Sequence, residues 1–153
     1  MTQDIQVGRV PATRVVSLRG RVATPPDQLA LWSSLMAQVA SAGVAIVATP
    51  LAVYHNNGMA EGAWDIEVCV PVAEAVDVGS LTATVLPAAE VAVIVHYGPL
   101  ARIGDAYEAM WAWMSANHRE LAGPIREMNV RPPASPGDQN DPQSVMEIQF
   151  PIA

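Results

Sequence analysis

The sequence predicts an α+β domain made of two copies of one unit, related by pseudo-two-fold symmetry. Two pairs of similar segments support this prediction. The segment "VPATRVVSLRG" (residues 10–20) is echoed by "LPAAEVAVIVHYG" (86–98), and "DIEVCVPV" (65–72) is echoed by "VMEIQFPI" (145–152). Each half therefore reads strand, strand, helix, strand, strand, with repeats at about residues 4–73 and 81–153 of a single domain (1–153). Two copies indicate a duplicated unit, because a solenoid requires at least three.

The first helix is expected to begin at Thr24 and to end at Gly43. "TPPD" offers a hydroxyl cap, prolines in the first turn and an acid at the third position, and glycine is typical just after a helix. The apolar face expected for this helix consists of Leu29, Trp32, Met36 and Val39.

The second helix is expected over residues 101–117. Its apolar face consists of Ile103, Tyr107, Met110 and Met114, and Trp111 and Trp113 flank that face. Since paired strands surround each helix, we expect both helices to pack on the same side of a curved antiparallel sheet.

The last strand of each repeat alternates between two faces. The expected core faces are Trp64, Ile66, Val68 and Val70 in the first copy, and Met146, Ile148 and Phe150 in the second. Glu67 and Glu147 occupy equivalent places on the opposite faces, which we expect to be solvated. Residues 130–144 predict a long exposed loop, with residues 55–63 as its shorter counterpart.

Composition excludes several classes of protein. The chain has 153 residues, 51% of them hydrophobic, without an apolar run long enough for a membrane span, and no leader is evident at its N-terminus. We therefore expect a soluble, cytoplasmic protein. With 15 acidic against 8 basic residues, direct nucleic-acid binding is not expected. Cys69 is expected to be a core thiol, and His55, His96 and His118 lack metal-ligand spacing, so no metal or cofactor is expected.

Glu127 stands out in the strand-like segment "GPIREMNV" (residues 123–130). A carboxylate on an apolar strand is costly to bury without a partner. It is therefore exposed on an edge strand, paired within the protein, or held in a site whose ligand compensates it, and the spacing alone does not favour the site over the surface.

The order and spacing of these segments resemble the GyrI-like or effector-binding domain family. This is the ligand-binding module also found at the C-termini of MerR-type and some AraC-type regulators. The resemblance lies in "LAVYHN", "DIEVCVPV", "LPAAEVAVIVHYGPL", "AYEAMWAWM", "GPIREMNV" and "MEIQFPI", and covers nearly the whole chain. It implies two βαββ units in a curved SOUL/GyrI-like sheet, with an aromatic-walled pocket around a central glutamate.

Within the family pattern E-x-Y, the glutamate matches Glu127, whereas Asn129 stands at the tyrosine position and Tyr54 occupies the corresponding place in the first copy. The resemblance thus selects Glu127 as the centre of a ligand site. Aromatic rings bind flat or cationic ligands, so we expect aromatic side chains to form the walls of this site. The other candidate ligand-binding residues are Trp111, Trp113, Tyr54, Asn129, Trp64 and Tyr97.

Three functions fit this resemblance. The first is a stand-alone module that binds an amphipathic, cationic or aromatic small molecule for sensing or sequestration. The second is a hydrolase that opens cyclopropanoid DNA-alkylating compounds, with Glu127 as the catalytic residue that assists attack by water. The third is a protein that binds a partner such as gyrase or a separate regulator through its acidic surface.

Overall fold

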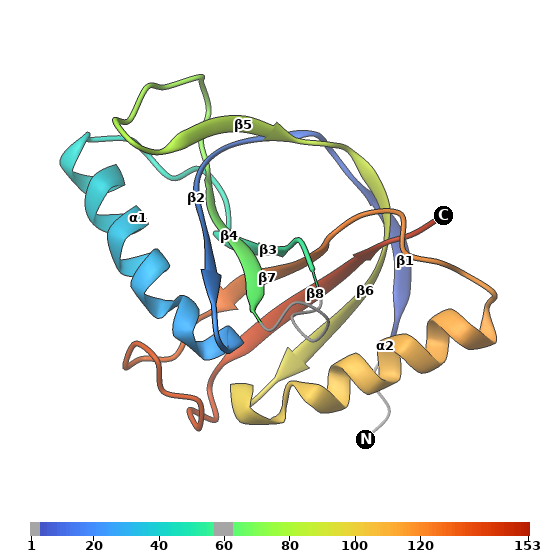
Figure 1. The fold of residues 1–153 in the computed structure, drawn as a ribbon. Helices are drawn as coiled ribbons and strands as arrows, with labels where there is room; N and C mark the ends of the chain where they lie inside the picture. Colours follow the sequence, from blue (N-terminus) through green and yellow to red (C-terminus); the bar gives the residue numbers. More distant parts are fainter. Residues whose placement is uncertain (1–3, 57–62) are drawn as a thin grey trace. The chain divides into compact units, whose positions relative to one another are not determined.

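The computed structural model describes residues 4–56 and 63–153, which form two compact units (Figure 1). The first unit comprises residues 11–88 and the second comprises residues 1–10 and 89–153. In the described residues each unit contains four antiparallel strands and one α-helix. The predicted α+β class and the duplicated order of elements are therefore confirmed.

The first unit has the strand order β3-β4-β2-β5, with α1 packed on β2 and β4. Its elements are β2 (Thr13–Val22), the 3₁₀ turn η1 (Pro25–Gln28), α1 (Leu29–Ser41), β3 (Leu51–Tyr54), β4 (Trp64–Pro71) and β5 (Thr82–Leu86). The predicted loop at residues 55–63 lies mostly outside the described residues.

The second unit has the strand order β1-β6-β8-β7, and α2 packs on β6. Its elements are β1 (Gln6–Val10), β6 (Ala89–Tyr97), the 3₁₀ turn η2 (Leu100–Arg102), α2 (Gly104–Ala116), β7 (Ile125–Arg131) and β8 (Val145–Pro151). The predicted loop before β8 is confirmed over residues 132–144, most of which are exposed.

The two repeats exchange their first strands. β1 is the first strand of the first repeat but pairs with β6 of the second, and β5 is the first strand of the second repeat but pairs with β2 of the first. Each compact unit therefore takes its edge strand from the other copy of the sequence repeat.

Both helices end in the same backbone motif. After α1 the amide of Val44 donates to Val39 O at 3.2 Å and that of Gly43 donates to Ala40 O at 3.1 Å. Gly43 has φ +69°, the left-handed conformation that this Schellman motif requires. At the N-terminal side, the predicted capping segment begins the 3₁₀ turn η1, whereas α1 itself begins at Leu29. Thr24 N and Oγ1 both donate to the carboxylate of Asp27.

The apolar face predicted for α1 is partly wrong. Leu29 and Met36 are exposed, whereas Leu35 and Val39 are buried. Leu31 also faces the sheet, since a methyl group at Gly20 would lie 3.0 Å from Leu31 Cδ2. The pattern did not fix the orientation because α1 carries apolar residues around most of its circumference, so several stripes satisfy a helical period.

The core faces predicted for the last strands are confirmed apart from Trp64, which is half-buried. Ile66, Val68 and Val70 are fully buried in the first unit. In the second unit Met146, Ile148 and Phe150 pack with Met110 and Met114 of α2, in agreement with the face predicted for that helix.

Candidate ligand-binding site

Glu127 lies on β7 and is only 7% exposed. Glu127 pairs in register with Ile148 on β8. On the other edge of β8, Ile94 of β6 also pairs with Ile148. Side chains of directly paired residues point to the same face of a sheet. Glu127 therefore lies on the apolar face of the second unit, which α2 covers.

The hydroxyl of Tyr107 on α2 donates a hydrogen bond to Glu127 Oε2. Tyr107 is half-buried, and its ring packs against Phe150 with the centroids 5.9 Å apart. The sequence predicted Tyr107 as a core residue, which the packing confirms, but did not identify it as the partner of Glu127. The feature of the sequence that could have indicated a partner is the hydroxyl group of Tyr107, because a buried tyrosine hydroxyl normally has a hydrogen-bond partner.

Trp111 extends the aromatic group on α2. Its ring meets Phe150 edge-on, with a centroid separation of 4.8 Å, and it remains 48% exposed. Trp111 thus combines a buried contact with an open ring surface, as a ligand-binding aromatic requires. Trp113 is half-buried and packs against the core of the second unit from the other flank of α2.

The structure places the other two candidates of this unit differently. Tyr97 is 71% exposed and follows Val93 and Val95 on the face of β6 opposite to Ile94. It is therefore not on the face that carries Glu127. Asn129 is half-buried on β7, within the irregularity between Met128 and Arg131.

Tyr54 and Trp64 belong to the first unit, where they meet edge-on at a centroid distance of 5.9 Å. The Tyr54 hydroxyl accepts a hydrogen bond from Gln28 Nε2 at 2.9 Å, and Gln28 Oε1 accepts one from Trp32 Nε1 at 2.9 Å. Tyr54 is buried, so this chain of polar contacts fixes its hydroxyl.

The first repeat has no counterpart of Glu127. In register Ala52 pairs with Val68, as Glu127 pairs with Ile148, and Val68 and Ile148 are equivalent in the two repeats. An alanine is thus sufficient to build the same strand position in the other copy. The buried carboxylate at this position is therefore present in the second copy alone.

Glu67 corrects an expectation of a solvated face. It is 9% exposed and accepts hydrogen bonds from Ser17 Oγ at 2.5 Å and from His55 Nε2 at 2.8 Å. Its equivalent, Glu147, is less buried and accepts a hydrogen bond from Gln149 Nε2 at 2.7 Å. The acidic side chains of β4 are therefore hydrogen-bonded within the protein, and part of this pairing is with Arg19 on the neighbouring strand β2. Arg19 pairs with Asp65 through two hydrogen bonds and lowers the pKa of that carboxyl.

Two buried polar atoms lack a partner among the described residues, namely His96 Nδ1 and Ser144 Oγ. The other ring nitrogen of His96 lies 2.9 Å from Pro99 O and must carry its proton, because a carbonyl only accepts. Among all residues that the structure describes, no group of three or more His, Cys, Asp or Glu side chains could hold a metal ion. Within the same residues no helix is long and apolar enough to cross a membrane.

Comparison with known proteins assigns the class. The model of the GyrI-like small molecule binding domain matches residues 3–153, so the chain belongs to this family. The fold is that of the EcmrR C-terminal domain, with 24% identity, a TM-score of 0.87 and coverage of 100% of this chain and 99% of that domain. No curated protein matches the sequence at the threshold applied.

Other solved structures share the fold. In the EcmrR–DNA complex the match has 24% identity and a TM-score of 0.85, and covers 98% of this chain but only 57% of the EcmrR chain. SAV2435 bound to tetraphenylphosphonium is 12% identical, with a TM-score of 0.67 over 98% of this chain and 94% of that chain. A hydrolase from Listeria innocua is 11% identical, with a TM-score of 0.66 over 97% and 91%.

Proposed function

We propose that the chain binds an amphipathic small molecule that is cationic or aromatic, with Glu127 as the charged contact, for sensing or sequestration. The observation that carries this proposal is the buried carboxylate of Glu127, which the fold does not require because Ala52 stands at the equivalent place. SAV2435, a relative in fold, is bound to the lipophilic cation tetraphenylphosphonium, which supports this class of ligand.

The aromatic residues near Glu127 support the same proposal. Tyr107 contacts the carboxylate directly, and Phe150 connects Tyr107 to the exposed ring of Trp111. A bound aromatic cation would gain from burial and from contact with ring faces, about 0.5–2 kcal/mol for each cation–π contact. Trp113 and Asn129, on the same unit as Glu127, remain further candidates for ligand contact. Tyr54 and Trp64 of the first unit stay predictions from the resemblance, and Tyr97 lies on the opposite face of β6.

Tryptophan fluorescence tests this proposal, because Trp111 lies on the same aromatic group. We expect saturable quenching of the wild-type protein by cationic aromatic dyes and at least tenfold weaker quenching of Glu127→Gln. Glu147→Gln is the matched control, since Glu147 is on the same unit but pairs with Gln149. Equal affinities of wild type and Glu127→Gln would exclude Glu127 as the charged contact.

Hydrolysis is the second candidate, favoured by the Tyr107–Glu127 contact. In this reaction Glu127 takes a proton from water while the water oxygen bonds to a cyclopropane carbon. The ring bond breaks, and its electron pair moves into the conjugated carbonyl, whose oxygen takes a proton from Tyr107 or solvent. The hydroxyl of Tyr107 thus supplies a group that the family pattern places at the position of Asn129.

Mass spectrometry distinguishes the two functions. Hydrolysis predicts that a cyclopropane-bearing alkylator gains one water with the wild type but not with Glu127→Gln. Binding without a change of mass would support sensing or sequestration. We also propose that the chain is cytoplasmic. The excess of acidic residues leads us to propose that it makes no direct contact with nucleic acid.

A further inference from the structure

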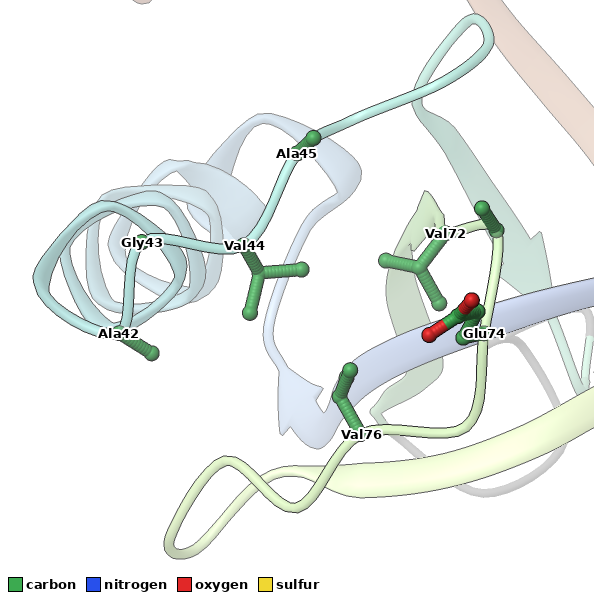
Figure 2. A pocket seen from close by; sticks show the side chains of 8 residues that line it. Ala42, Gly43, Val44, Ala45, Val72, Glu74 and Val76 are labelled. Atoms are coloured by element: carbon green, nitrogen blue, oxygen red, sulfur yellow. The ribbon is translucent and has the colours of Figure 1, made fainter.

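The first unit holds an open pocket of about 350 Å³ between the C-terminal end of α1 and the segment after β4 (Figure 2). Its lining residues are Ala42, Gly43, Val44, Ala45, Val72, Ala73, Glu74 and Val76. Glu127 belongs to the second unit and is not among them. The pocket is therefore separate from the proposed ligand site.

Backbone hydrogen bonds fix both walls of this pocket. On the α1 side, the Schellman motif holds Val44 through its bond to Val39 O. On the other side, the amide of Val72 donates to Arg14 O at 3.0 Å. The amide of Val47 donates to Pro71 O at 3.0 Å and so connects the two segments. The backbone at Val44 and Val72, on the two sides of the pocket, is thus held by the fold.

Most side chains that line the pocket are apolar. Figure 2 shows Val44, Val72 and Val76 directed toward a common space, with the carboxylate of Glu74 on the side of residues 72–76. The volume is at the lower end of the range for small-molecule sites, roughly 300–1,000 Å³. The lining therefore suits a compact aliphatic group.

The charge carried by the pocket lining is negative. Glu74 is the one ionisable residue in the lining, and the C-terminal end of α1 adds the negative end of a helix dipole. The lining contains no lysine or arginine, and Asp77 follows Glu74 closely in the sequence. A positively charged ligand is thus attracted to this surface and an anion is repelled.

We propose that this pocket is a second binding site, which takes a small organic cation with an aliphatic ammonium group. The methyl or methylene groups contact the valines, and the charge faces Glu74 and the end of α1. Because Glu74 is exposed, the ion pair is weak, and we expect a dissociation constant on the order of a millimolar.

Choline chloride and its neutral isostere 3,3-dimethylbutan-1-ol test this proposal, since they differ in charge but hardly in shape. Methyl NMR spectra of the full chain are recorded at constant ionic strength during each titration. We expect saturable shifts of the methyl groups of Val44, Val72 and Val76 with choline. The isostere should bind at least threefold more weakly.

Three variants locate the site. Glu74→Gln should weaken choline binding at least threefold, whereas Asp77→Asn, a matched change on the same exposed segment, should weaken it less. Glu127→Gln should leave these shifts unchanged, so failure here is distinguishable from failure of the proposed function. Equal binding of the isostere, absence of saturable shifts, or their loss in Glu127→Gln would each overturn the proposal.

Discussion

The hydroxyl of Tyr107 donates a hydrogen bond to the buried carboxylate of Glu127 and thereby joins α2 to β7. The two residues are 20 positions apart in the chain, and both contact the apolar core of the second unit. This contact gives the carboxylate a donor within the protein. It also holds the carboxylate beside the aromatic group formed by Tyr107, Phe150 and Trp111.

Tyr107→Phe should lower the free energy of unfolding by about 1–3 kcal/mol, because the buried carboxylate of Glu127 loses one hydrogen-bond donor. In a Glu127→Met background the same change should cost less than about 0.5 kcal/mol, since no carboxylate remains to be satisfied. Urea denaturation of the four proteins measures this coupling. Equal costs in both backgrounds would show that the hydrogen bond does not contribute to stability.

Ser144→Ala should raise the free energy of unfolding by about 1 kcal/mol, because it removes a buried hydroxyl that has no partner among the described residues. Ser17→Ala is the matched control. Ser17 is equally buried, but its hydroxyl donates to Glu67, so this change should lower stability by about 1–3 kcal/mol. Thermal or urea unfolding measures both, and destabilisation by Ser144→Ala would contradict the assignment.

His118→Gly should stabilise the protein by about 0.5–1 kcal/mol. His118 ends α2 as Gly43 ends α1, with the same pair of backbone bonds, and has φ +53°. A glycine adopts this conformation without steric cost. Conversely, Gly43→Ala should destabilise by about 1–2 kcal/mol. Denaturant midpoints measure both changes, and the same sign for both would disprove the explanation.

The Arg19–Asp65 pair predicts a dependence of stability on acid. The two hydrogen bonds from Arg19 lower the pKa of Asp65 below its ordinary value of 3.8. The resulting stabilisation is complete above that ordinary value and disappears as the pH falls through the lower pKa of the folded state. Since Arg19 is 53% exposed, we expect at most about 1 kcal/mol.

Arg19→Gln should therefore be less stable than the wild type at pH 6, with a difference that shrinks as the pH falls below 3.8. Urea denaturation over this range measures the difference. Arg14→Gln, an exposed change on the same strand, should show little pH dependence. A difference for Arg19→Gln that stays constant with pH would contradict this explanation.

The sequence was sufficient to predict the elements of the fold, because the strand alternation and the helix caps are local signals. Thr24, Gly43 and the core faces of β4 and β8 are where these signals placed them. The orientation of α1 was not predictable from its pattern, since both Leu29 and Leu35 fit an apolar face and only packing distinguishes them.

Contacts between segments that are distant in the chain could not be predicted from the sequence. Nothing near Glu127 indicates that Tyr107 is its donor, and nothing near Glu67 indicates that Ser17 and His55 satisfy it. The exchange of β1 and β5 between repeats is likewise a long-range pairing. Spacing alone left Glu127 undecided between an exposed, a paired and a ligand-compensated carboxylate. Its burial excludes the exposed alternative, and Tyr107 pairs it within the protein.

The most direct test of the proposed function is the affinity of tetraphenylphosphonium for wild type and Glu127→Gln, measured by calorimetry with Glu147→Gln as control. The proposal predicts binding by the wild type and the control, and at least tenfold weaker binding by Glu127→Gln, because the ligand cation loses its buried charged partner. Equal affinity in all three proteins would contradict it.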